Sequence, residues 1–92
     1  MDFEWDQNKA TANLKKHGVK FEDAVHVFLD PDRIETLDAR EAYSEDRWIS
    51  IGMVFPAIIV VVYTLRNKTG QVIRLISARR ADRNERAQYA KV

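Results

Sequence analysis

One apolar run constrains the fold of this chain more than any other stretch. Residues 57–63 are all apolar or aromatic, and five of them in succession are β-branched. The run is much shorter than the ~20 apolar residues that span a bilayer, and β-branched side chains favour strands. It lacks the alternation of a half-exposed strand, so both of its faces should be covered. We therefore predict that it is the central strand of one sheet.

The segments around this run show strand and turn patterns. Apolar residues recur at every second position of residues 48–53, which is the period of a strand. Residues 33–38 form a shorter candidate strand, and residues 71–78 follow the run after a hairpin turn at 67–70. This order predicts an antiparallel meander of four strands, to which residues 3–5 add a candidate edge strand.

Two helices are predicted ahead of the meander. Asp6 is a good N-cap for a helix over residues 7–16, and Gly18 fits the left-handed position that ends many helices. A second helix follows and ends at residues 30–32, where a proline stands. Its apolar stripe at i, i+3, i+4 and i+7 consists of Phe21, Ala24, Val25 and Phe28.

A third helix is predicted at the C-terminal end. Asp82 and Glu85 have the D-x-x-E spacing of a capping box. The helix that they open carries Arg83, Arg86, Tyr89 and Lys91. Residues 1–92 are therefore predicted to form a single α+β domain, an antiparallel sheet of four or five strands covered by two N-terminal helices, with a basic C-terminal helix.

The composition of the chain limits its expected cellular location, cofactors and binding partners. The chain has no cysteine, which excludes disulfides and thiolate chemistry, and no pattern of a signal peptide or membrane span, so a cytoplasmic protein is expected. His17 and His26 lack metal-ligand spacing, so we expect no metal or other cofactor. Residues 22–46 hold nine acidic and two basic side chains, whereas residues 74–92 hold six basic and two acidic. The basic end can meet phosphate and the acidic middle a basic partner, although solvated faces commonly explain such runs.

The first candidate site lies where the last strand ends. Arg79 and Arg80 adjoin the helix that carries Arg83 and Arg86. Guanidinium groups can hold phosphate bidentately and stabilise the negative charge of phosphoryl chemistry. Tyr89 can add a stacking surface or a proton donor. The alternative is a solvated basic helix whose arginine stems pack on the sheet edge.

The second candidate site is the end of the first helix. His17 can act as a general acid or base, Lys16 can hold a phosphate, and Lys15 adds a further RNA contact. A histidine that caps helix carbonyls is the alternative explanation.

A third candidate combines Asp38 with Glu45, Asp46 and Arg47, near the hairpin end that also carries Arg66. If a four-residue turn pairs Arg66 with Gln71, then Arg66 and Arg79 share a sheet face but lie about 20 to 25 Å apart, at ~3.3 Å per residue. That separation is too large for one catalytic centre, so this register makes the two arginines competing anchors.

Several segments taken together resemble a known family. They include W-D at residues 5–6, K-H-G-V at 16–19, E-D-R at 45–47 and I-S-A-R at 76–79. In this order and spacing they resemble the BrnT family, the toxins of bacterial type II toxin-antitoxin pairs. The resemblance covers almost the whole chain and is specific only as a set.

The resemblance implies a RelE-like fold and a metal-independent endoribonuclease that inhibits translation and growth. It also implies a BrnA-like ribbon-helix-helix antitoxin, assembled with the toxin in a heterotetramer, through which the toxin meets operator DNA. RNA cleavage by 2′-hydroxyl attack needs proton carriers and cations around the phosphate. The candidate catalytic residues are Lys16, His17, Glu45, Arg47, Arg66 and Arg79, with Arg79 favoured, and the candidate RNA-binding residues are Lys15, Arg80, Arg83, Arg86 and Tyr89.

The chain departs from the family pattern in one loop. Glu41, Ala42 and Ser44 stand where a histidine, a serine and a glycine are expected. Any proton transfer by that histidine would need another residue here. The alternative function is a non-catalytic module that binds RNA or only the antitoxin, and a third is an interaction protein whose acidic middle binds a basic partner.

Overall fold

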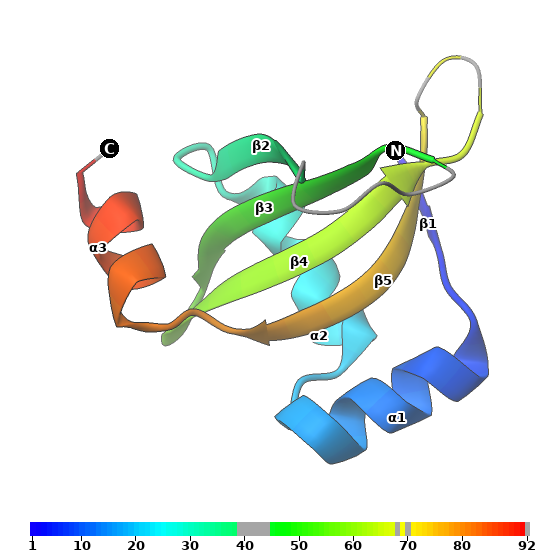
Figure 1. Ribbon diagram of the computed structural model, residues 1–92, viewed down its shortest axis with the longest axis horizontal. Helices are drawn as coiled ribbons and strands as arrows, with labels where there is room; N and C mark the ends of the chain where they lie inside the picture. The colour runs from blue at the N-terminus through cyan, green and yellow to red at the C-terminus, as the bar shows by residue number, and fades with distance from the viewer. Residues whose placement is uncertain (39–44, 68, 70, 92) are drawn as a thin grey trace.

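A computed structural model of the chain describes residues 1–38, 45–67, 69 and 71–91, and shows an α+β domain (Figure 1). The apolar run forms the middle strand of a five-stranded sheet with the order β1-β5-β4-β3-β2, as predicted. The strands are β1 (Asp2–Glu4), β2 (Ile34–Asp38), β3 (Arg47–Val54), β4 (Ala57–Leu65) and β5 (Val72–Arg80). The helices are α1 (Gln7–His17), α2 (Phe21–Ala24), the 3-10 helix η1 (Val25–Leu29) and α3 (Arg83–Ala90). None of these helices has both the length and the apolar character needed to cross a membrane.

The predicted meander is confirmed for four strands. Neighbouring strands from β2 to β5 pair in antiparallel fashion. The N-terminal strand β1 does lie at an edge, but it pairs with β5 in parallel. The sheet is therefore mixed, and the prediction of a wholly antiparallel sheet is wrong for β1.

Local signals set the helix ends as predicted. The Asp6 carboxylate accepts hydrogen bonds from the backbone N–H groups of Asn8 and Lys9 at 2.8 and 3.2 Å. Gly18 ends α1 in the left-handed region, at φ 71°. At the other end of the chain, Asp82 and Glu85 form the capping box of α3.

The second predicted helix is correct in place but not in period. After Ala24 the chain tightens into the 3-10 helix η1, which has three residues per turn. Phe21, Ala24 and Val27 are therefore fully buried at a spacing of three, whereas Val25 is only half-buried. The 3-10 helix η1 lies close to β3: a Cβ added at Gly52 would be only 2.9 Å from a methyl carbon of Val27.

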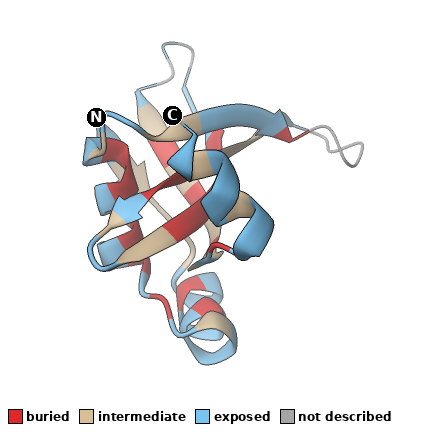
Figure 2. Cartoon of the chain, turned by 90° about the vertical axis from the view of Figure 1, so that its left-hand side faces the viewer, coloured by how far each residue is buried: buried red, intermediate tan, exposed pale blue. Residues whose placement is uncertain are grey.

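The two faces of the sheet are covered by different elements. The face that we call the α1–α2 face holds the larger core, in which Phe21, Val61 and Ala78 are completely buried. On the opposite face, the α3 face, Tyr89 packs against a small cluster that includes Ile51 and Val60. Buried residues accordingly lie along the strands, while α3 is largely exposed (Figure 2). The α1–α2 face of β4 is buried at Ile59, Val61 and Tyr63, whereas its α3 face is covered at one end and Val62 is only half-buried, so the predicted cover of both faces is confirmed in part.

A β-bulge in β5 changes the register of the last hairpin. Val62 pairs with Ser77, but the next residue, Tyr63, pairs with Leu75. The bulge and a loop that is longer than expected place the Arg66 N–H against the Val72 carbonyl, at 2.9 Å. The predicted pairing of Arg66 with Gln71 is therefore wrong. Strand β5 also continues to Arg80, two residues beyond its predicted end.

Asn13 joins α1 to the edge of β5. The short strand β1 pairs only with the first three residues of β5. Further along, the buried Asn13 amide takes the place of a neighbouring strand: it donates to the Ala78 carbonyl at 2.8 Å and accepts from the Ala78 N–H at 3.1 Å. Its second N–H bonds the Val19 carbonyl at 3.0 Å. One side chain thus satisfies three buried backbone groups.

We predict that Asn13→Ala lowers the free energy of unfolding by about 2 kcal/mol or more, because it leaves buried polar groups unpaired. Urea unfolding measures the change. Asn8→Ala is the matched control, since it makes the same replacement at an exposed position of the same helix and should change stability by no more than about 0.5 kcal/mol. Equal effects of the two variants would contradict the role assigned to Asn13.

Candidate functional site

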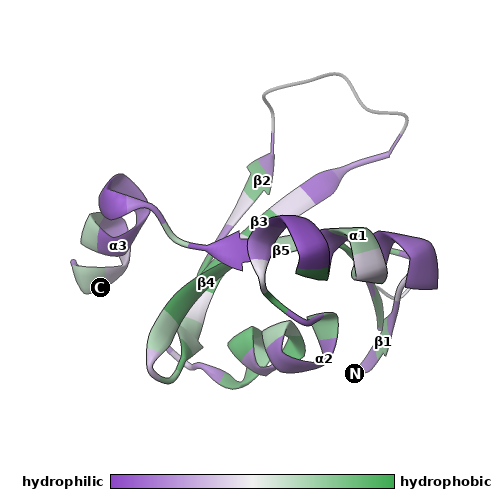
Figure 3. Cartoon of the chain, turned by 90° about the horizontal axis from the view of Figure 1, so that it is seen from below, coloured by the Kyte–Doolittle hydropathy of each residue, from purple (hydrophilic) through white to green (hydrophobic). Residues whose placement is uncertain are grey.

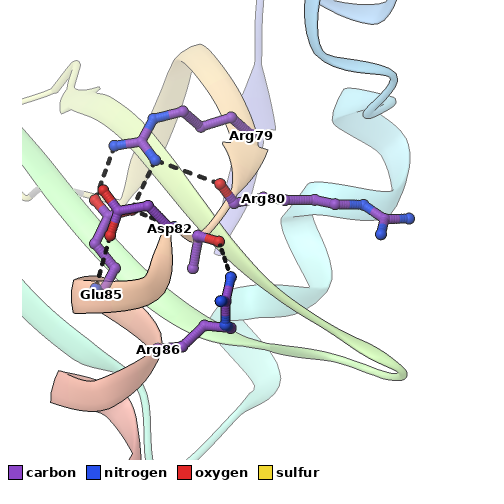
Figure 4. Close-up of polar contacts among 6 residues, drawn as sticks. Arg79, Arg80, Asp82, Glu85 and Arg86 are labelled. Atoms are coloured by element: carbon purple, nitrogen blue, oxygen red, sulfur yellow. Dashed lines mark hydrogen bonds and ion pairs between the residues drawn. The ribbon is translucent and has the colours of Figure 1, made fainter.

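Arg79 and Arg80 belong to opposite faces of the sheet. Both lie in β5, where successive side chains alternate. Arg79 points toward α3, and Arg80 extends the other way (Figure 4). Arg80 lines a groove of about 360 Å³ on the α1–α2 face, together with Gly18, Asp23 and the side of Phe55. The two adjacent arginine side chains therefore leave β5 in different directions.

Arg79 forms a bidentate ion pair with Glu85. Its Nη1 and Nη2 atoms lie 2.7 and 2.8 Å from the two oxygens of the Glu85 carboxylate. Nη1 also donates to the Arg80 carbonyl at 3.3 Å. The pair is partly buried, with 35% of the Arg79 side chain and 18% of the Glu85 side chain exposed. The hydrogen bond from Arg79 is the main cause that lowers the pKa of Glu85, so Glu85 is ionised at neutral pH.

The same carboxylate holds the first turn of α3. Glu85 accepts a hydrogen bond from the Asp82 N–H at 2.8 Å, and the Asp82 carboxylate accepts one from the Glu85 N–H at 2.8 Å. Arg86 donates to the Ala81 carbonyl at 2.8 Å, while Arg83 is exposed on the outer side of the helix. The capping box of α3 and the orientation of Arg79 thus share one residue (Figure 4).

Tyr89 fastens the other end of α3. Its hydroxyl donates to the Asp30 carboxylate at 2.5 Å, and that same oxygen accepts the Met53 N–H at 2.7 Å. The bond to Asp30 raises the pKa of Tyr89 to about 12. Partial burial alone would raise the pKa of Asp30, but the hydrogen bonds that it accepts lower it overall. Tyr89 therefore anchors α3, which leaves its hydroxyl poorly suited to donating a proton in catalysis.

A row of polar side chains crosses the α3 face farther along the strands. Thr64 pairs with Arg74, and the Arg74 Nη1 atom lies 2.7 Å from a Glu4 carboxylate oxygen. Only 1% of Thr64 is exposed, and its hydroxyl has no hydrogen-bond partner within the described ranges. From β2 to β1, the row consists of Asp38, Arg47, Thr64, Arg74 and Glu4. Arginines from two further positions thus share a sheet face with Arg79.

Glu45 and Arg66 lie together beyond this row. Arg66 Nη1 is 3.7 Å from a Glu45 carboxylate oxygen, and both side chains are close to half exposed. Arg79 pairs with Val60, which is six residues from Arg66, so the two arginines are separated by about 20 Å at ~3.3 Å per residue. Although the predicted register is wrong, this separation agrees with the predicted one. The departures from the family pattern at Glu41, Ala42 and Ser44 fall outside the described residues.

Lys15, Lys16 and His17 lie on a different element from Arg79. They form the last turn of α1, which packs against β5 from the α1–α2 face. Both α1 and α3 carry hydrophilic residues, but the two helices occupy different parts of the molecule (Figure 3). The structure brings together Glu45 with Arg66, and separates both His17 and Arg80 from Arg79.

The sequence alone does not indicate that Arg74 and Glu85 belong to this candidate site. Strict alternation along β5 would place Arg74 with Arg80, and only the bulge moves it to the face of Arg79. The spacing of Glu85 from Asp82 predicts only a capping box and gives no sign that Glu85 also contacts Arg79. In the described part of the chain, no group of three or more histidine, cysteine, aspartate or glutamate side chains is arranged to hold a metal ion.

These features define the class of the molecule, a small α+β domain with arginines from two strands on one sheet face. A family model described as "Ribonuclease toxin, BrnT, of type II toxin-antitoxin system" matches residues 5–85, so the chain belongs to this family. It is also similar to the crystal structure of the Brucella abortus ribonuclease toxin BrnT, with a TM-score of 0.66 and 26% identity over 90% of this chain and 99% of that one. No curated protein sequence matches. Membership of the family implies an antitoxin partner.

We predict that Tyr89→Phe lowers the free energy of unfolding by about 1 kcal/mol at pH 7, and by less at pH 3. The Tyr89 bond favours ionised Asp30, whose pKa lies below its ordinary value of 3.8, so its contribution is present above that value and lost as the pH falls through the lowered one. Urea unfolding at both pH values measures the effect.

Tyr63→Phe is the matched control for this prediction. It also removes a tyrosine hydroxyl, but that hydroxyl bonds the neutral Ser50 side chain at 3.0 Å. Its cost should be the same at pH 7 and pH 3. A cost of Tyr89→Phe that does not change with pH would contradict the proposed link to Asp30.

Proposed function

We propose that this chain is the toxin of a type II pair that arrests growth by cleaving cellular RNA, without a metal ion, through 2′-hydroxyl attack. A ribbon-helix-helix antitoxin of the BrnA kind would inhibit it in a heterotetramer and link it to operator DNA. Membership of the BrnT ribonuclease-toxin family supports the reaction. The single structural observation that carries the proposal is the shared sheet face of Arg47, Arg74 and Arg79.

We propose that RNA lies along the α3 face. Phosphodiesters are suited to guanidinium groups. Arg47 and Arg74 lie in one row across the strands and Arg79 lies farther along β5, so the three arginines can meet different phosphates of one RNA strand. Between them, Ile49 pairs with Val62, and both are half-buried, which offers apolar contact to bases. Arg83 and Arg86 of α3 extend the basic surface beside Arg79.

Proton transfer is best supported near Glu45. Glu85 has a lowered pKa and a bidentate partner, which make it a weak base, and the Tyr89 hydroxyl is held by Asp30. His17 and Lys16 lie in the last turn of α1, on a different element from the arginines of the α3 face. Glu45, by contrast, is exposed beside Arg66 and two residues before Arg47. It therefore combines a proton acceptor with nearby cations.

The proposed reaction follows from these positions. Glu45 takes the proton of the 2′-hydroxyl, and the oxygen attacks the adjacent phosphorus. The bond to the 5′-oxygen breaks, which leaves a 2′,3′-cyclic phosphate, and the departing oxygen takes a proton from water. Arg47 and Arg66 stabilise the charge on the phosphoryl oxygens. Arg79, about 20 Å away by strand spacing, holds another phosphate of the same strand.

Expression of the chain alone in a bacterial host should stop growth and degrade RNA, and co-expression of the antitoxin should restore both. Growth curves and total RNA electrophoresis provide the measurement. Normal growth with intact RNA, despite soluble folded protein, would overturn the proposed function.

Purified protein should cleave single-stranded RNA equally with and without a chelator such as EDTA. Glu45→Gln should lower kcat about 100-fold, within the range for a lost general base. Arg79→Ala should mainly raise KM, because it removes a phosphate contact distant from the reacting atoms. His17→Ala, in the last turn of α1, serves as the control and should change neither constant more than about twofold.

Two outcomes of this assay would count against the proposal. Full activity of Glu45→Gln, or a large loss with His17→Ala, would refute the assigned centre. RNA binding without cleavage by the wild type would favour the non-catalytic binding module. That module has one observation in its favour: the Glu85 carboxylate, which bonds Arg79 at 2.7 and 2.8 Å, has a lowered pKa and is therefore a weak base.

A further inference from the structure

The end of the Arg79 guanidinium is already occupied by an anion. Its two terminal nitrogens each donate to a different oxygen of Glu85, at 2.7 and 2.8 Å. A phosphodiester presents the same planar pair of acceptor oxygens to an arginine as a carboxylate does. In the structure, therefore, Glu85 stands where a phosphate would bind Arg79 end-on.

Glu85 does not depend on Arg79 for its place in the fold. Its carboxylate accepts the Asp82 N–H, and its own N–H donates to the Asp82 side chain, both at 2.8 Å. Neither of these bonds involves Arg79. The Arg79 guanidinium lies at the end of a long side chain that is 35% exposed, whereas Glu85 is held in the first turn of α3. Of the two partners, Arg79 is the one that can move to a ligand.

We propose that Glu85 is an intramolecular occupant of the Arg79 phosphate subsite, and that an RNA phosphate binds Arg79 by displacing it. The proposal rests on the proposed RNA-binding function of the α3 face. Glu85 then limits how tightly the face holds RNA, because each binding event must break the ion pair. It also favours ligands with bidentate oxygens, since a single acceptor cannot replace both bonds.

A competing role for Glu85 would be to orient Arg79 for RNA. The two roles predict opposite signs. If Glu85 orients Arg79, its replacement by glutamine weakens RNA binding. If it competes, the replacement removes both a negative charge beside the bound phosphate and an ion pair that must be broken. The charge effect should dominate, because the pair is bidentate and only partly exposed.

The test measures binding of a labelled single-stranded RNA oligonucleotide whose 2′-hydroxyls are all methylated, so that it cannot be cleaved. Glu85→Gln should bind it about tenfold more tightly than the wild type. The slope of log affinity against log salt should steepen by about 0.7, the value for one phosphate charge on a single strand, because the Glu85 charge that offsets Arg79 in the wild type is gone. A purely structural effect on α3 would not produce that change of slope.

Two further variants provide the controls. Asp82→Asn removes the same charge from the same helical turn and keeps a good N-cap. The Asp82 carboxylate accepts the Glu85 N–H, so affinity should change less than twofold. In an Arg79→Ala background, Glu85→Gln should have no effect, because the subsite is gone. Circular dichroism verifies that α3 and the sheet are retained in every variant.

A measurement on the wild type avoids substitution altogether. The carboxyl carbon signal of Glu85 in an NMR spectrum should shift when the methylated oligonucleotide is added, as the Arg79 bonds break. An unchanged Glu85 signal in the bound state would overturn the proposal. So would weaker binding by Glu85→Gln, an equal gain from Asp82→Asn, or a gain that persists without Arg79.

These outcomes are separate from those of the cleavage assay. The methylated probe reports binding alone, so a wild type that binds it but cleaves no RNA would refute the proposed reaction and leave this inference standing. Failure of all the variants to bind the probe would overturn the inference.

Discussion

The fold depends on covering both faces of β4. Its apolar residues alternate between two cores, and neither face can be left to water without losing much of the hydrophobic stabilisation. The α1, α2 and η1 helices cover one face broadly. The other is covered at one end by α3, which brings Tyr89 over Ile51 and Val60. Because α3 must sit there, its first turn lies beside Arg79, and the ion pair with Glu85 follows from that placement.

Features determined by neighbouring residues could be predicted from the sequence. The N-cap at Asp6, the left-handed Gly18 and the capping box at Asp82 each depend on a few adjacent backbone groups, and all three are present. The central position of β4 was likewise evident from its composition. In contrast, the period of the second helix was wrong, since a close approach between Val27 and Gly52 accompanies its tightening into η1. That contact lies between distant segments and leaves no local pattern.

The candidate site was less predictable than the fold, and the bulge in β5 is the main reason. A single extra residue reverses the facing of every side chain on one side of it. Arg74 therefore joins Arg79 instead of Arg80, which no alternation rule would indicate. Arg79 was evident as a candidate because it ends the last strand beside the basic helix, whereas its partner Glu85 was hidden because one carboxylate serves both a helix cap and an arginine. The residue types predicted the kind of chemistry, but which side chains contact each other depends on the register of β5 and the placement of α3.

The α3 face also depends on Asn13, a residue of α1 that holds the backbone of β5 in place. Its amide replaces a missing strand next to Ala78, the residue immediately before Arg79. It does so from the α1–α2 side, where no proposed RNA contact lies. A genetic screen that selects cells surviving the toxin would therefore recover two kinds of lesion. Some would remove arginines from the RNA-facing surface, and others would loosen the backbone that carries them from behind the sheet.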